Sequence, residues 1–127
     1  MPLVRIDLNE GRTRAELSAI SEGVHRALVE AISIPEHDRF QVVREHPAGG
    51  LVYDPEYLSI PKTRGAVFVQ ITMSSGRTVD QKKGLYAAIV RNLSSGAGVL
   101  PADVFVNLVE VAKENWSFGN GAAQYAT

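Results

Sequence analysis

The sequence predicts an α/β (α+β) fold: two consecutive β-α-β units form a four-stranded sheet with two helices on one face. Three observations support this fold. Strand-like and helix-like segments follow one another in the same order twice. Each of the two expected helices begins with a capping-box motif. Short matches also recur 65 positions apart: Gly11-Arg12-Thr13 with Gly76-Arg77-Thr78, Asp38 with Asp103, and Phe40 with Phe105.

The first unit spans residues 2–46. Residues 2–8 alternate apolar and polar side chains, as a half-buried strand does. Thr13-Arg14-Ala15-Glu16 opens a helix, in which apolar residues recur at helical spacing. Ile34-Pro35 ends this helix, because the residue before a proline disfavours the helical conformation. Phe40-Gln41-Val42-Val43-Arg44 is the second strand.

The second unit, residues 66–111, follows a long irregular connection and repeats the same order. Ala66–Met73 is rich in valine and isoleucine and predicts a strand. Thr78-Val79-Asp80-Gln81 is a second capping box, with glutamine at the reciprocating position. The helix that it opens ends within Ser94–Gly98, and Val104–Val111 is the fourth strand.

Length and composition favour a single soluble domain covering residues 1–127, with a C-terminal tail at residues 112–127. Hydrophobic residues make up 45% of the chain and the net charge is −1, so nothing favours nucleic-acid or membrane binding. Cysteine is absent, which rules out disulfides and thiolate metal sites, and the spacing of His25, His37 and His46 suggests no metal site. We expect a cytoplasmic protein that needs no cofactor.

The two faces of the expected sheet differ in polarity. One is apolar, with Val4, Ile6 and Leu8 from the first strand and their counterparts from the third. The other mixes polar and aromatic side chains: Arg5, Asp7, Gln41, Gln70, Thr72 and Asn107 with Phe68 and Phe105. A face packed against other subunits would accommodate both kinds, so we expect an oligomer. The alternative is a monomer with an ordinary half-polar sheet face.

Pro2 is the first candidate catalytic residue. An initiator methionine followed by a small residue such as proline is usually removed, which would leave a secondary amine at the start of the first strand. A free α-amine titrates at roughly 8 in model peptides, and burial or a nearby cation disfavours its protonated form. Such an amine could act as a base near neutral pH, or as an acid where its surroundings favour the cation. Alternatively, the proline follows the start codon by chance.

Arg77 is the second candidate, because it lies just before the capping threonine of the second helix. An anion there would meet both a guanidinium and the free amides of a helix N-terminus, which suits a substrate carboxylate. The alternative is a solvated turn arginine, and we favour that reading for Arg12, its counterpart in the first unit. In the tail, Trp116 and Phe118 alternate around Ser117 and could line one pocket, or pack against a neighbouring subunit.

The chain resembles the tautomerase superfamily, and within it the malonate semialdehyde decarboxylase branch, in which two β-α-β units are fused. Four segments carry the resemblance: Pro2-Leu3-Val4-Arg5-Ile6-Asp7-Leu8, Ile34-Pro35-Glu36-His37-Asp38-Arg39-Phe40-Gln41, Gly76-Arg77-Thr78 and Trp116-Ser117-Phe118-Gly119. The resemblance implies a homotrimer and catalysis by the N-terminal proline on a small carboxylate substrate. It implies that Arg77 binds the carboxylate and that Tyr125 is a further pocket aromatic. Ser75 stands where some members carry a second arginine.

The resemblance also implies that Asp38 assists the proline and can activate water. A carboxylate beside a cationic amine would stabilise its charged form; the alternative is an ion pair with Arg39 or a loop cap. The expected activity is keto–enol tautomerisation, decarboxylation of malonate semialdehyde type, or both, with hydration of acetylenic acids as a possible side activity. The rival hypothesis is a non-catalytic oligomeric protein of the same fold that binds a ligand.

Overall fold

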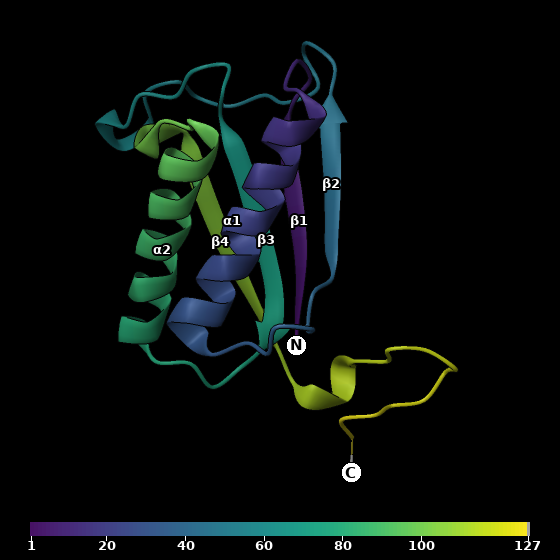
Figure 1. Ribbon diagram of the computed structural model, residues 1–127. Helices are drawn as coiled ribbons and strands as arrows, with labels where there is room; N and C mark the ends of the chain where they lie inside the picture. The colour runs from purple at the N-terminus through teal and green to yellow at the C-terminus, as the bar shows by residue number, and fades with distance from the viewer. Residues whose placement is uncertain (127) are drawn as a thin grey trace.

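A single mixed sheet covered on one face by two helices forms the body of the computed structural model, which describes residues 1–126 (Figure 1). The strand order is β2-β1-β3-β4; β1 pairs parallel with β2 and antiparallel with β3, and β3 pairs parallel with β4. This confirms the predicted fold class. The elements are β1 (Pro2–Asn9), α1 (Arg14–Ile32), β2 (Gln41–His46), β3 (Val67–Ser74), α2 (Val79–Ala97) and β4 (Val104–Val111). Short 3₁₀ turns occur at Tyr57–Ser59, Pro101–Asp103 and Lys113–Asn115.

Both helices begin as the capping boxes predict. Thr13 accepts a hydrogen bond from the backbone N–H of Glu16, whose carboxylate accepts one from the Thr13 N–H. Thr78 and Gln81 form the same reciprocal pair at α2. The glycine two residues before each cap has a φ of about +125° (125° for Gly11, 127° for Gly76), a conformation that a side chain would strain. The two strand-to-helix turns therefore share one geometry.

The core lies between the helices and the apolar face of the sheet. Alternate residues of β1 and β3 are buried against the helices, as the period-2 pattern predicts, and residues of both helices complete the layer. At Gly23 the two helices come close, because a β-carbon there would lie 2.9 Å from the Leu93 side chain. The largest fully buried side chains are Ile6, Leu8, Ile20, Leu28, Ile71, Met73, Leu85, Ile89 and Leu93.

The prediction for Gln41 was wrong. It was assigned to the mixed face of the sheet, but it pairs in register with the buried Val4 and shares its direction. Its side-chain amide donates to the Ser21 carbonyl of α1 at 2.9 Å, on the helix side. Because β2 is an edge strand at the margin of the helix layer, a polar residue there is only half-buried and keeps a hydrogen-bond partner.

Two opposite ends of the sheet carry the residues that recur 65 positions apart. We call one the first corner: the start of β1 with Pro2, the loop before β2 with Asp38, and the turn after β3 with Arg77. The second corner lies at the opposite end and is formed by Arg12, residues 63–65 and Asp103. Figure 1 shows the N-terminus at the first corner, on the side where the tail leaves β4, and the 47–66 connection at the second. Within residues 1–126, no helix has an apolar stretch long enough to cross a bilayer.

Candidate active site

Pro2 lies at the wall of a cavity at the first corner. It opens β1 opposite Met73 of β3 and is buried. Proline is tolerated here because it is the first residue of its strand. The cavity has a volume of about 230 Å³ and is lined by Met1, Pro2, Leu3, Phe40, Trp116, Ser117 and Phe118. The fold therefore joins the start of the chain to its tail, about 115 positions apart in sequence.

Asp38 lies beside the N-terminal cation. Its Oδ2 is 3.7 Å from the Met1 ammonium, and its side chain is 12% exposed. Its Oδ1 is buried and has no hydrogen-bond partner among the described residues. Arg39 instead forms an ion pair with Glu22, at 2.6 Å, so the expected alternative pairing of Asp38 with Arg39 is not observed. Asp38 thus keeps one carboxylate oxygen unpaired beside Met1, although Asp38 itself is not among the residues that line the cavity.

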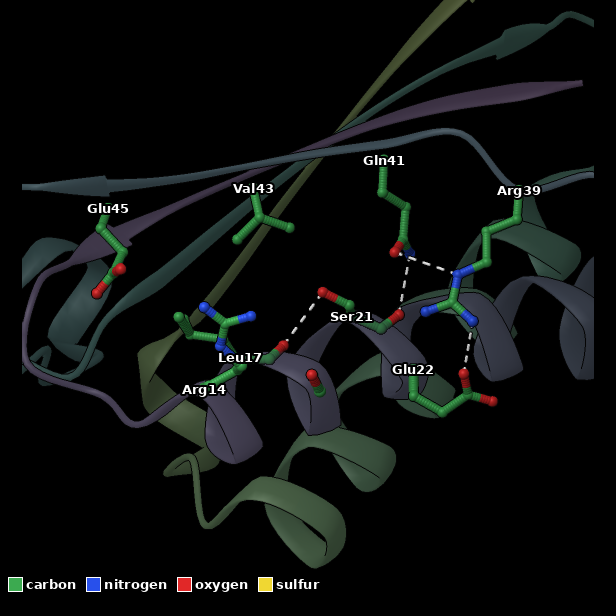
Figure 2. Close-up of a pocket in the computed structure, with 9 residues that line it drawn as sticks. Arg14, Leu17, Ser21, Glu22, Arg39, Gln41, Val43 and Glu45 are labelled. Atoms are coloured by element: carbon green, nitrogen blue, oxygen red, sulfur yellow. Dashed lines mark hydrogen bonds and ion pairs between the residues drawn. The ribbon is translucent and has the colours of Figure 1, made fainter.

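Helix α1 fixes the loop that carries Asp38. Figure 2 shows Arg39 between Glu22 and Gln41 in a groove of about 600 Å³ between α1 and β2. The polar groups labelled there are largely engaged with one another, and none of the predicted site residues lines the groove. We therefore assign the groove a structural role. The ion pair with Arg39 also holds the pKa of Glu22 below its usual value.

Two further side chains of α1 hold the same loop. His25, only 2% exposed, makes a 2.9 Å hydrogen bond through Nε2 to the Glu36 carbonyl. Arg26 pairs with the Glu36 carboxylate at 2.5 Å and lowers its pKa. Sequence reasoning assigned no role to His25; a polar residue among the buried positions of an amphipathic helix was the available signal. Together these contacts of α1 with Glu36 hold the loop that carries Asp38 in place.

Arg77 connects to the cavity through Ser74. Its Nη1 donates to the Ser74 carbonyl at 3.1 Å, while the indole N–H of Trp116 donates to Ser74 Oγ at 3.1 Å. Neither Arg77 nor Ser75 is among the residues that line the cavity. The ion pair with Lys82 lowers the pKa of Glu110, and the positive charge of Arg77 lowers it further to a smaller extent. Arg77 therefore lies close to the Glu110 carboxylate as well. The structure brings Arg77 to the first corner but leaves its guanidinium outside the cavity wall.

The tail folds over the cavity as an aromatic cluster. Trp116 and Phe118 stack with ring centroids 5.5 Å apart, and Tyr125 meets Phe118 edge-on at 4.9 Å. Gln124 closes the intervening loop by accepting from the Phe118 N–H and donating to the Gly119 carbonyl. Tyr125 therefore supports Phe118 from outside the wall. Phe40, which does line the cavity, was not predicted as a site residue, although it recurs in both units.

At the second corner, the arginine and the aspartate both form hydrogen bonds with residues 63–65 of the same chain. Arg12 donates to the Gly65 carbonyl at 2.7 Å. Asp103, 2% exposed, accepts from the Thr63 N–H at 2.7 Å and from its hydroxyl at 2.6 Å. These contacts support the structural reading of Arg12. No cluster of three metal-ligating side chains that could hold an ion occurs within residues 1–126.

Comparison with known proteins assigns the family. A family model described as a tautomerase enzyme matches residues 38–119, and a second model with the same description matches residues 2–60. A probable tautomerase of Bacillus subtilis, YusQ, is 40% identical over 98% of both chains. The chain belongs to the tautomerase superfamily. The two overlapping matches also indicate a fused double unit.

Solved structures of other tautomerases agree with this fold. FG41 malonate semialdehyde decarboxylase, inhibited by 3-bromopropiolate, is 38% identical, with a TM-score of 0.90 over 97% of this chain and 93% of that one. A fused 4-OT described as a symmetric trimer is 25% identical, with a TM-score of 0.80 over 98% of both chains. The predicted membership is confirmed, and the chain is a tautomerase-family enzyme.

Proposed function

We propose that this tautomerase uses the amine of Pro2, freed by removal of Met1, as a general acid and base on a small 2-oxo or 3-oxo carboxylate. The observation that carries the proposal is the position of Pro2. It lies on the wall of a cavity that also contains the aromatic tail, next to a carboxylate with one unpaired oxygen. A proton-transferring group must lie within hydrogen-bond reach of its substrate, and a substrate in this cavity would meet that condition.

Asp38 would set the proton state of the amine. The Met1 ammonium at 3.7 Å stands in for the cationic N-terminus that processing would move to Pro2. A carboxylate at this distance favours the cation, whereas burial favours the neutral amine. The balance lets the amine exchange a proton during turnover. The free Asp38 Oδ1 could instead orient a water, which supports a hydratase side activity.

Arg77 would bind the substrate carboxylate. The second corner offers a physical precedent, because there the equivalent Arg12 donates to the Gly65 carbonyl oxygen. At the first corner a substrate carboxylate oxygen would take the corresponding place beside Arg77. A single arginine, with Ser75 in place of a second, would hold one carboxylate and polarise the adjacent carbonyl.

In the tautomerase reaction, Pro2 removes the proton from the enol hydroxyl and returns a proton to the neighbouring carbon, which leaves the ketone. The aromatic rings of the tail keep water out and strengthen the electrostatic interactions inside the cavity. The likeness to FG41 malonate semialdehyde decarboxylase supports a second candidate activity. There the protonated amine would polarise the aldehyde carbonyl, the carboxylate would leave as carbon dioxide, and the resulting enolate would take up a proton at carbon.

The mixed sheet face supports a homotrimer as the working assembly. Val42 and Val109 are exposed on the face away from the helices. A monomer would leave these side chains in water, whereas a neighbouring copy would bury them. Native mass spectrometry of the purified protein should give three chains per particle; a monomer would contradict this part of the proposal.

The test compares processed wild type with the Pro2→Ala and Arg77→Ala variants, after intact mass has established that Met1 is absent. Ketonisation of phenylenolpyruvate and decarboxylation of malonate semialdehyde are assayed side by side. We expect both variants to lose activity in at least one assay. A matched control inserts lysine between Met1 and Pro2, which retains the methionine and makes the proline nitrogen an amide. Equal rates for all four proteins would favour the rival hypothesis of a non-catalytic ligand-binding protein.

A further inference from the structure

The second corner contains a cavity with the same architecture as the active-site cavity. Its volume is about 430 Å³, and its walls include Phe68 and Phe105, which lie 65 positions after Leu3 and Phe40 of the first cavity. The tail after β4 covers the first cavity, and the connection after β2 covers the second. The two cavities therefore occupy equivalent places in the two halves of the fold.

The walls of the second cavity are mainly apolar and aromatic. Phe68 contacts Tyr53 edge-on at 5.3 Å and Phe105 at 5.2 Å, so three rings form a continuous surface. Leu58 closes one side together with Tyr57 and Ile60 of the connection. Its φ of +55° is unusual for a leucine, as is the +59° of Ser59. Non-glycine residues held in this region persist where surrounding contacts fix them, often at ligand sites.

Lys62 is the cation of this cavity. Its ammonium donates to the Ala102 carbonyl at 2.8 Å and lies 6.0 Å from the Phe105 ring centroid. An ammonium has three donors, so two remain for a ligand. The Asp54 carboxylate also lines the cavity, but one of its oxygens accepts from the Glu56 N–H and caps a local turn. Asp103 does not line the cavity, and both of its carboxylate oxygens accept hydrogen bonds from Thr63.

We infer that this second cavity is a binding site for a small carboxylate with an aromatic or branched apolar body. The carboxylate would pair with Lys62 and the apolar body would pack on the three rings. The site has no counterpart of the proline amine, because Val67 stands there as an internal residue. The ligand would therefore bind without being converted. This inference does not depend on the chemistry proposed for Pro2.

The test measures binding of phenylacetate to the full-length protein by methyl NMR and calorimetry, with phenylacetamide as the uncharged control. We expect saturable shifts at the methyl groups of Ile60 and Val106. Lys62→Gln should weaken binding about tenfold, as expected for loss of a charge-assisted hydrogen bond, and phenylacetamide should lose a similar factor against wild type. Arg77→Gln should leave these shifts unchanged, which separates this site from the active site.

Leu58→Asn is the matched variant for the apolar wall, since asparagine tolerates a positive φ while it removes the apolar contact. It should weaken phenylacetate binding several-fold and leave ketonisation activity unchanged. Three results would overturn the inference: no shifts at Ile60 and Val106, equal affinity of Lys62→Gln and wild type, or equal affinity of the acid and the amide. Dissociation of the oligomer in Leu58→Asn without ligand binding in wild type would show that another copy of the chain fills the cavity.

Discussion

The first and second corners carry the same polar residue types but use them differently. Each has an aspartate before a strand and an arginine before a helix cap, 65 positions apart. At the second corner both side chains bind the chain itself: Asp103 binds Thr63 and Arg12 binds Gly65. At the first corner Arg77 donates to the Ser74 carbonyl of the adjoining turn, and Asp38 keeps an unpaired oxygen.

Exchanging the two arginines for alanine should give the largest difference between the corners. Arg77→Ala should lower kcat/KM by about 10²–10³, because removal of one well-placed donor to a developing charge costs that much in other enzymes. Arg12→Ala should leave kcat/KM unchanged and lower the free energy of unfolding by about 1–3 kcal/mol, since a charged donor to the Gly65 carbonyl is lost.

Steady-state kinetics and urea unfolding of both variants measure these two effects. If Arg12→Ala reduced kcat/KM as strongly as Arg77→Ala, the second corner would not be merely structural. If neither variant changed kcat/KM, Arg77 would be a turn residue like its counterpart.

The two aspartates provide the next comparison. Asp103→Ala should destabilise the protein by about 1–3 kcal/mol, because it removes a buried carboxylate that accepts hydrogen bonds from the Thr63 N–H and hydroxyl. Asp38→Asn should change stability little and reduce turnover by about 10–100-fold, since a general acid–base assistant contributes on that scale. Asp103→Ala should therefore lower the Tm more than Asp38→Asn does, whereas Asp38→Asn should lower turnover more than Asp103→Ala does. A stable Asp103→Ala protein would contradict the structural assignment of that carboxylate.

Trp116→Phe tests how the tail is held over the first cavity. The substitution keeps an aromatic ring that can stack on Phe118, and it removes the indole N–H that donates to Ser74 Oγ together with part of the ring area. Loss of one neutral hydrogen bond costs about 0.5–1.5 kcal/mol, so we expect a three- to tenfold rise in KM. Phe118→Leu is the control for the stacking itself. An unchanged KM in Trp116→Phe would mean that stacking alone positions the tail.

Local sequence signals predicted most of the fold. Capping boxes and apolar periodicity depend on neighbouring residues, so the starts of both helices and the buried faces of β1 and β3 followed from the sequence. The face of Gln41 did not, because it depends on where β2 pairs with β1, and a shift of one residue reverses the face. Roles that arise from long-range contacts, such as the loop support by His25, were also inaccessible.

Only some of the predicted site residues line the cavity, for a similar reason. Pro2, Trp116 and Phe118 line one cavity, and Asp38 lies beside the chain terminus. Tyr125 supports Phe118 without lining that cavity, and Arg77 reaches it only through Ser74. These differences depend on side-chain direction at the end of the sheet, which sequence spacing does not specify. The roles of all these residues in turnover stay predictions, as do the limits of the two repeated units.

The ion pair between Glu22 and Arg39 should give the smallest effect, and it has no charged counterpart at the second corner, where Val104 matches Arg39. Because Arg39 lowers the pKa of Glu22 in the folded protein, the pair stabilises the fold above the ordinary glutamate pKa of about 4.3 and loses this contribution as the pH falls through the folded pKa. Glu22→Gln should therefore cost below about 1 kcal/mol at pH 7, as partly exposed pairs do, and less than that at pH 3.

Urea unfolding of wild type and Glu22→Gln at the two pH values measures this difference. Glu30→Gln is the matched control, because Glu30 pairs with Arg91 on the outer surface of α1, away from the Asp38 loop. Since the Glu22 pair anchors the residue next to Asp38, Glu22→Gln should also lower turnover slightly, whereas Glu30→Gln should not. Equal turnover in both variants would mean that the His25 and Arg26 contacts to Glu36 suffice to hold Asp38 in place.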